Sequence, residues 1–305
     1  MRPTRGFRIL TLAAAVSAWA LVAVGGIVRV TESGLGCPDW PLCDGRVVPV
    51  QQKEPMIETS HRWVAGLVTV LVVVAAVWAW RRYRSREDVV FPAVAALLLI
   101  PAQALLGAVV VWLELPGWIV GVHFVVGVLL LAATVLAAGA AWRDSPSSRA
   151  SESFVRLVWL TTGVGLLLVA LGAAVVSADA DHACGQDWPA CNGAFATGGA
   201  DAWLQVSHRS AAYLVGGLVL AIAVQAWRGR GPRLAGSAPL AAVAVQIAFG
   251  VSLVLVGEGS AAHEPLAMLH VAGAATVWAM LVALGALVGL PRHEHFPAAL
   301  AAGTR

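Results

Sequence analysis

The chain has 305 residues, of which 12% are charged and 59% are hydrophobic, and its formal net charge is +3. Soluble proteins usually carry about 25% charged residues. So few charges cannot cover the surface of a soluble protein, which excludes a cytosolic enzyme, a nucleic-acid-binding protein and a disordered chain. The sequence therefore predicts an integral membrane protein that is surrounded by lipid and has no nucleic-acid partner.

Eight stretches without Asp, Glu, Lys or Arg follow one another, each long enough to cross a hydrocarbon layer of about 30 Å as a helix. They cover residues 9–28, 63–80, 89–113, 115–142, 157–178, 210–227, 234–257 and 265–291. None of them alternates between polar and apolar residues, as the strands of a membrane β-barrel do. The first stretch lacks a clear signal-peptide cleavage site. We therefore expect an all-α membrane protein with eight transmembrane helices.

Basic residues are distributed unevenly between the two sides of these helices. The N-terminus, the loops after the second, fourth and sixth stretches and the C-terminal tail together hold 15 of the 20 Lys and Arg residues. Cytoplasmic loops carry such an excess. We therefore expect both termini in the cytoplasm of a multi-pass plasma membrane protein, with long outer loops at about 31–60 and 178–207.

The two long loops contain all four cysteines, in Cys37-Pro-Asp-Trp-Pro-Leu-Cys43 and Cys184-Gly-Gln-Asp-Trp-Pro-Ala-Cys191. An oxidising outer surface favours one disulfide in each loop. Free thiols or a metal-binding pair are the alternatives, although two cysteines without nearby histidines make a poor zinc site. Neither segment has the C-x-x-C-H pattern of covalent haem attachment.

The chain also repeats itself. Three pairs of residues are separated by the same interval of 147: Cys37 and Cys184, His61 and His208, and His123 and His270. This interval indicates a duplicated four-helix unit. Because each unit has four helices, the copies share one orientation and form a parallel repeat. We expect an N-terminal half at 1–145 and a C-terminal half at 146–305, the latter with a short cytoplasmic tail.

Each half places two histidines at or within the outer ends of its spans, His61 and His123 in the first and His208 and His270 in the second. Ionisable residues in spans are candidates for function. One imidazole from each of two helices can hold a haem iron from both faces. Nearby small residues leave room for a flat ring: Ala65, Gly66, Gly121, Gly127, Gly216, Gly217, Gly273 and Ala274. A hydrogen bond to a neighbouring helix is the simpler alternative for any one histidine.

Two further features accompany the histidines. Arg62 and Arg209 directly follow His61 and His208 at the water boundary, where each can bind a haem propionate or simply reach toward water.

Glu58 lies three residues before His61, whereas the equivalent residue before His208 is Gln205. A carboxylate can accept a proton or stabilise positive charge, so Glu58 is the candidate catalytic residue. Its alternative is to orient His61 or begin a helix.

Over residues 8–290 this pattern resembles the haem A synthase family, membrane enzymes that convert haem O to haem A. The resemblance rests on eight spans in two similar halves, the motif Glu58-Thr59-Ser60-His61-Arg62, the paired histidines and the paired loop cysteines. It implies oxidation of the C8 methyl group of haem O to a formyl group, for the assembly of aa3-type terminal oxidases.

The resemblance also implies roles for individual residues. His61 and His123 would flank the substrate haem O and the product haem A, with Glu58 acting in the hydroxylation. His208 and His270 would bind the iron of a resident haem b. Disulfides would join Cys37 to Cys43 and Cys184 to Cys191. Haem O synthase and terminal oxidase assembly factors are the implied protein partners, and the sequence leaves open whether copies form a homo-oligomer.

Two other functions fit part of the pattern. A dihaem cytochrome b that passes electrons from quinol and synthesises no haem would use the same four histidines. It gives no reason for Glu58 in one half at the position where the other half has Gln205. A transporter or haem-handling scaffold would favour acidic residues or broken helices near the middle of the membrane, and the charge-free stretches hold no acid there.

Overall fold

The computed structural model describes residues 2–143, 150–191, 193, 198–257 and 259–289. Within these residues the chain forms eight α-helices and two short 3-10 helices, with no β-sheet. The α-helices are α1 (Arg5–Val30), α2 (Lys53–Arg82), α3 (Glu87–Trp112), α4 (Gly117–Trp142), α5 (Glu152–Ser177), α6 (Ala200–Trp227), α7 (Leu234–Val256) and α8 (His263–Val288). The expected boundary at 145 and 146 and the C-terminal tail lie outside the described residues.

All eight helices are long and apolar enough to cross a membrane, which confirms the eight spans expected from the sequence. Six helices begin earlier than the charge-free stretches do, and α2 and α6 differ most, each by ten residues. Helix α2 begins at Lys53 and α6 at Ala200, so each includes a polar segment that precedes the charge-free stretch. His263, expected in an outer loop, is instead the first residue of α8.

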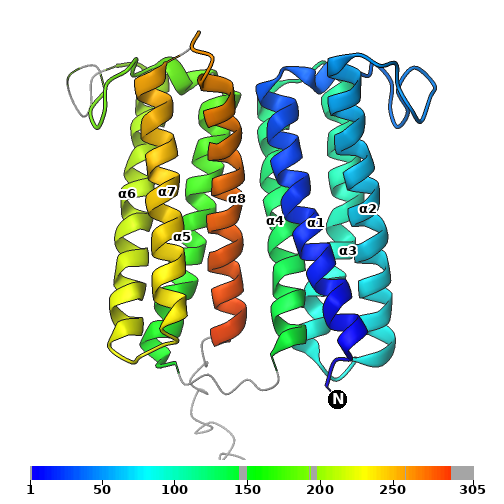
Figure 1. The fold of residues 1–305 in the computed structure, drawn as a ribbon, viewed down its shortest axis with the longest axis vertical. Coiled ribbons are helices and arrows are strands. Elements are labelled where there is room, and N and C mark those ends of the chain that lie inside the picture. The colour runs from blue at the N-terminus through cyan, green and yellow to red at the C-terminus, as the bar shows by residue number, and fades with distance from the viewer. Residues whose placement is uncertain (1, 144–149, 192, 194–197, 258, 290–305) are drawn as a thin grey trace, which may run out of the picture.

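The helices form two groups that stand side by side (Figure 1). Helices α1 to α4 make one group and α5 to α8 the other, and the long loops before α2 and α6 lie at the end opposite the N-terminus. Helices α1, α4, α5 and α8 meet between the groups. Helices α3 and α7 lie at the periphery and are the least buried.

Side chains from both groups share one apolar core. Its buried members come from α1, α2, α3, α4 and α8. Two indoles cross the boundary between the groups: Trp19 Nε1 donates to Thr276 Oγ1 at 3.0 Å, and Trp278 Nε1 donates to the Val128 carbonyl at 2.8 Å. The two groups are therefore packed together as one body.

The outer surface of the helices is strongly apolar. Phe91 is 78% exposed, Trp118 is 70% exposed and Leu98 is 67% exposed. A soluble protein rarely exposes so much contiguous apolar surface. These side chains are suited to contact with lipid, in keeping with a multi-pass membrane protein.

Local backbone features recur at the interval found in the sequence. Thr4 and Ser151 each cap the first helix of a group through a side-chain oxygen. The left-handed residues Glu32 and Asp179 each precede a 3-10 helix, at Ser33–Leu35 and Ala180–His182. The cis peptides Trp40–Pro41 and Trp188–Pro189 also correspond. The interval of about 147 residues thus separates matching backbone conformations as well as matching residue types.

Candidate functional site

The four histidines lie on four different helices, one each on α2, α4, α6 and α8, and all are half-buried. Within each half the two imidazoles are close enough to interact electrostatically, His61 with His123 and His208 with His270. The structure therefore brings together the pairs that the sequence predicted.

Each imidazole packs against a glycine on the preceding helix. A methyl group built on Gly25 of α1 would lie 3.1 Å from Cε1 of His61. The same construction on Gly107 of α3 gives 3.3 Å to Cε1 of His123. Carbon atoms in contact prefer about 3.5–4.0 Å. Only glycine therefore leaves the rings of the N-terminal half where they are.

The C-terminal half has the same arrangement. A methyl group on Gly172 of α5 would lie 2.9 Å from Cε1 of His208, and one on Gly250 of α7 would lie 3.1 Å from Cε1 of His270. Gln246 adds a contact here, because its Nε2 lies 3.1 Å from Nδ1 of His270 and donates to the His270 carbonyl at 3.0 Å.

The Nδ1 atoms of His61, His123 and His208 are buried and have no hydrogen-bond partner. Buried polar atoms are usually paired. Because the Cε1–Nδ1 edge of each ring faces the glycine, Nε2 is the nitrogen that lies farther from that glycine. This arrangement fits a ring that is held at one edge and binds a metal-centred group at the other.

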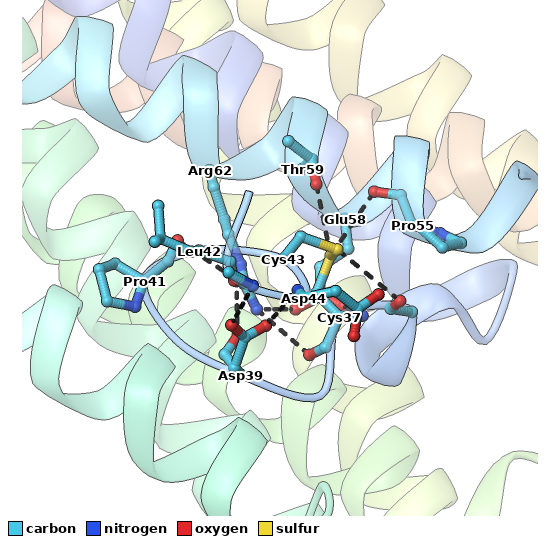
Figure 2. Close-up of a disulfide and its surroundings, with 12 residues drawn as sticks. Cys37, Asp39, Pro41, Leu42, Cys43, Asp44, Pro55, Glu58, Thr59 and Arg62 are labelled. Carbon is cyan, nitrogen blue, oxygen red and sulfur yellow. Dashed lines mark hydrogen bonds and ion pairs between the residues drawn. A yellow bond between two sulfur atoms is a disulfide. The ribbon is translucent and has the colours of Figure 1, made fainter. Parts of the chain in front are cut away.

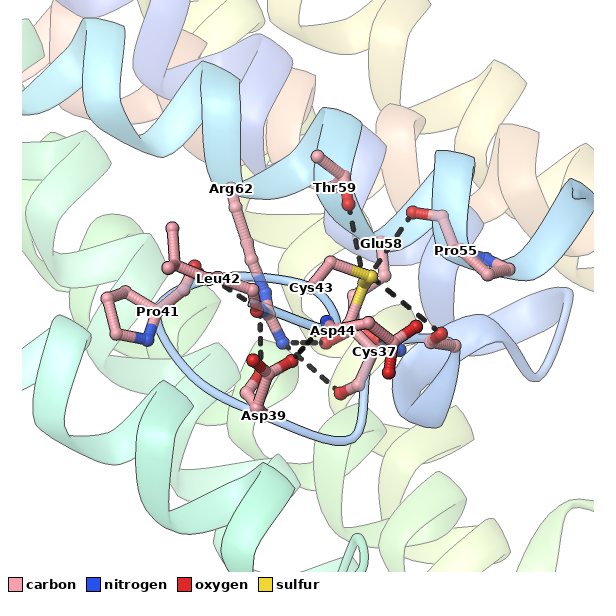
Figure 3. Close-up of polar contacts among 11 residues, drawn as sticks. Cys37, Asp39, Pro41, Leu42, Cys43, Asp44, Pro55, Glu58, Thr59 and Arg62 are labelled. Atoms are coloured by element: carbon pink, nitrogen blue, oxygen red, sulfur yellow. Dashed lines mark hydrogen bonds and ion pairs between the residues drawn. A yellow bond between two sulfur atoms is a disulfide. The ribbon is translucent and has the colours of Figure 1, made fainter. Parts of the chain in front are cut away.

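Glu58 does not stand free beside the histidine pair. It is buried, with 4% of its surface exposed, and its carboxylate faces the first disulfide loop (Figure 3). Oε2 accepts a hydrogen bond from the Cys37 amide at 2.8 Å, and Oε1 accepts one from Arg62 Nη2 at 2.5 Å. Both bonds favour the ionised carboxylate.

Arg62 completes this connection between the loop and α2. Its guanidinium donates to the carbonyls of Asp39, at 2.8 Å, and of Leu42, and forms an ion pair with Glu58. In this structure Arg62 therefore holds the loop in place. Its binding of a propionate stays a prediction.

The second loop is held differently. Arg209 Nη1 donates to the carbonyls of Asp187, at 2.8 Å, and Ala190, at 2.6 Å. Gln205 is buried too, but its amide donates to the Asp181 carbonyl instead of accepting from a cysteine amide. In the described residues Arg209 forms no ion pair like that of Arg62 with Glu58, and its Nη2 is buried without a hydrogen-bond partner.

Both expected disulfides are present, which confirms the pairing of the cysteines. Cys37 bonds to Cys43 (Figure 2), and Cys184 bonds to Cys191. Thr59 Oγ1 lies 3.3 Å from the Cys37 sulfur, which seats the first bridge on α2. The described residues contain no free cysteine.

Asp39 shapes the first loop from within. Its two carboxylate oxygens accept from the amides of Asp44, at 2.6 Å, and Gly45, at 2.8 Å. The Gly45 amide, the Asp44 amide and the Arg62 charge lower the pKa of Asp39 below its ordinary value of 3.8. The carboxylate is therefore ionised at neutral pH and closes the turn.

The expected space for a ring beside Gly121 and Gly273 is occupied by protein. A methyl group on Gly121 would lie 2.5 Å from Ser177 Oγ of α5, and one on Gly273 would lie 2.2 Å from Gln246 Oε1. These two glycines admit neighbouring side chains, so this interpretation was wrong for both.

Comparison with known proteins gives a consistent result. The chain matches the COX15-CtaA family, described as cytochrome oxidase assembly protein, over residues 8–282. The chain belongs to the COX15-CtaA family. Two similar relatives are the haem A synthase of Bacillus licheniformis, 32% identical over 234 residues, and that of Shouchella clausii, 33% identical over 230 residues. These alignments cover 73% and 72% of this chain and 76% and 75% of the relatives.

For this member of the COX15-CtaA family, reasoning from the sequence missed the four glycines that contact the histidines, Gly25, Gly107, Gly172 and Gly250. Gly25 and Gly172 contact His61 and His208, and they are themselves 147 residues apart. That interval was the available signal. In an apolar helix rich in small residues, however, a glycine normally indicates only helix packing.

No group of three or more metal-binding side chains occurs in the described part of this COX15-CtaA chain. Zinc sites usually need three or four protein ligands. Paired histidines with buried Nδ1 atoms, set against glycines, fit an iron that already carries four ligands from a porphyrin.

Proposed function

We propose that this protein oxidises the C8 methyl group of haem O to the formyl group of haem A, for the assembly of aa3-type terminal oxidases. Membership of the COX15-CtaA family and relatives named haem A synthase support a role in haem A biosynthesis. The observation that carries the proposal further is an asymmetry. Both halves hold a histidine pair, but among the described residues only the N-terminal half has a buried carboxylate, Glu58, which lies three residues before His61.

The two halves, 1–145 and 146–305, form a parallel repeat in this proposal. Equivalent helix caps, left-handed residues and histidine–glycine contacts support it. Both termini face the cytoplasm of the plasma membrane, and the disulfide loops lie on the outer face. The excess of basic residues on the N-terminal side supports this orientation, as does the position of the loops at the opposite end (Figure 1).

His61 and His123 would hold the iron of haem O, and His208 and His270 would hold a resident haem b. The glycine opposite each ring and the buried Nδ1 atoms support both assignments. Haem iron, when bound, supplies one-electron redox chemistry. The chain itself supplies the imidazoles, their orientation and an apolar environment.

The two arginines differ in whether they have an unused hydrogen-bond donor for a haem propionate. Arg62 already pairs with Glu58 and with loop carbonyls. Arg209 also binds loop carbonyls, but its buried Nη2 retains an unused donor. A charged donor buried without an acceptor is costly, and a propionate would satisfy it. Arg209 is therefore the stronger candidate, beside the resident haem b.

Glu58 would act on the substrate in the N-terminal half. Its carboxylate is held in one position by the Cys37 amide and Arg62, so little reorganisation is needed when charge develops nearby. A carboxylate at this place can take up a proton or stabilise positive charge on the ring substituent. Gln205 can do neither, which supports a non-catalytic second half.

The test replaces Glu58 by glutamine and analyses the extracted pigments. Glu58→Gln should keep its haem b but yield no formyl haem. Glu54→Gln is the matched control, because Glu54 lies one turn earlier on α2 and is exposed. Normal haem A from Glu58→Gln would overturn the catalytic assignment.

A second variant examines the resident haem and the alternative function. His208→Ala should lose the haem b absorption spectrum while the N-terminal half stays folded. An unchanged reduced spectrum would contradict the ligand assignment. A dihaem cytochrome b that only carries electrons would produce no formyl haem in the wild-type protein, so the same extraction separates the two functions.

A further inference from the structure

The histidine-bearing helices alternate with glycine-bearing helices along the whole chain. Helices α2, α4, α6 and α8 each supply a histidine, and α1, α3, α5 and α7 each supply the glycine that faces it. The atoms nearest to a methyl group built on any of these four glycines, outside its own helix, all belong to the facing histidine. The four glycines thus share one neighbour type, the edge of an imidazole.

This contact differs from ordinary close packing of helices. Glycines in membrane helices usually let two backbones approach, and Gly117 does so here, since a methyl group on it would lie 2.2 Å from the Ser177 carbonyl oxygen. At Gly25, Gly107, Gly172 and Gly250 the nearest atoms are instead Cε1 and Nδ1 of a histidine.

We propose that Gly25, Gly107, Gly172 and Gly250 are positioning residues, which set how close each imidazole lies to the neighbouring helix and hence where its Nε2 meets iron. This proposal rests on the proposed function, in which the four histidines are axial ligands. With glycine, the Cε1–Nδ1 edge of each ring lies against the helix, and Nε2 lies farther from the glycine than either of these atoms. In His270, Nε2 also lies 3.4 Å from Gln246 Nε2. A methyl group would push the ring away by a few tenths of an ångström.

The distances predict an order of severity. Gly172 is the tightest contact, at 2.9 Å, Gly25 and Gly250 follow at 3.1 Å, and Gly107 is the loosest at 3.3 Å. Residues that orient a metal ligand typically change metal affinity 10- to 100-fold when mutated. We expect Gly172→Ala to weaken haem b binding by about 10-fold or more, and Gly250→Ala to do so less severely.

The experiment uses the full-length protein, purified in detergent with its haem. Haem b per polypeptide, the reduction potential and the low-spin absorption and electron paramagnetic resonance signals are measured for Gly172→Ala and Gly250→Ala. The matched control is Gly163→Ala, on the same helix as Gly172, because Gly163 is exposed and has nothing within 4 Å. The control should match the wild type in all three measurements.

A positioning role changes the signals of the haem that remains bound, whereas a merely structural role lowers the yield of folded protein and leaves those signals unaltered. Wild-type haem content, potential and spectra in Gly172→Ala would overturn the proposal. If that variant fails to fold, Gly250→Ala decides in the same way. Retention of haem b by His208→Ala would instead refute the proposed ligands, so the two failures are distinguishable.

The N-terminal half provides a further check within the same molecule. Gly25→Ala should leave the haem b signals as they are and lower the amount of haem O that copurifies. A loss of haem b signals from Gly25→Ala comparable to that from Gly172→Ala would contradict the assignment of each glycine to its own histidine.

Discussion

Glutamine at position 58 should loosen the first disulfide loop from α2, apart from any effect on chemistry. Glu58 accepts from the Cys37 amide at 2.8 Å and from Arg62 at 2.5 Å. The side chains of Glu58 and Arg62 are only 6% and 15% exposed, so water cannot readily replace these bonds. The side-chain amide of glutamine has one acceptor oxygen and one NH2 group. Its oxygen can accept from either the Cys37 amide or Arg62, but its NH2 group then faces the remaining donor.

The size of this effect follows from the bonds lost. A hydrogen bond to a charged group contributes about 1.5–3 kcal/mol. Losing one such bond should favour local opening of the loop by about 2 kcal/mol, which is about 30-fold in the opening equilibrium. Amide hydrogen exchange of the peptide that contains the Cys37 amide measures this directly.

The second loop is the internal reference for this experiment. Gln205 and Arg209 hold it independently of Glu58, so its exchange should not change in Glu58→Gln. Glu54→Gln should leave both loops at wild-type rates. Equal protection of the first loop in wild type and Glu58→Gln would refute the reasoning that the carboxylate holds it.

Three other predictions concern the loop and the packing of the two halves. Trp278→Phe should lower thermal stability by about 1 kcal/mol, because a buried carbonyl on α4 loses its donor. Gly117→Ala should cost about 1–3 kcal/mol in a thermal melt, because a methyl group would lie 2.2 Å from the Ser177 carbonyl oxygen; a wild-type melting curve would contradict this. The Gly45 amide lowers the pKa of Asp39 in the folded protein. The ionised Asp39 carboxylate therefore stabilises the loop fully at a pH above the ordinary pKa of the side chain. This stabilisation is lost as the pH falls through the lowered pKa. The protection of the loop amides, meaning exchange relative to the unfolded rate at the same pH, should therefore be unchanged from pH 7 to 5, and Asp39→Asn should lower it throughout.

The spans could be predicted because hydropathy is a property of consecutive residues. A helix in lipid must satisfy its own backbone, so a long charge-free stretch has few other structures open to it. The same rule misplaced the starts of α2 and α6. Arg62 and Arg209 interrupt the charge-free stretches, yet both lie inside helices because loop carbonyls accept their hydrogen bonds.

The histidine pairs and the disulfides could also be predicted, since a constant interval of 147 residues marks matching positions along the chain. The direction of the Glu58 side chain could not be predicted. A spacing of three residues allows it to share a face with His61, but the carboxylate bonds to Cys37, which is 21 residues away. The folding of the loop over α2 decides that contact.

The sequence by itself determined the eight spans, the interval of 147 residues between matching residues, the four histidines and the contrast between Glu58 and Gln205, because composition and interval are read along the chain. Only the tertiary structure decided which glycine faces which imidazole, and that Arg62 is engaged where Arg209 keeps a buried donor. Those contacts depend on how each helix is rotated and placed against its neighbour. In helices made mostly of Ala, Leu, Val and Gly, the apolar pattern is too uniform to fix that rotation, and close packing fixes it instead.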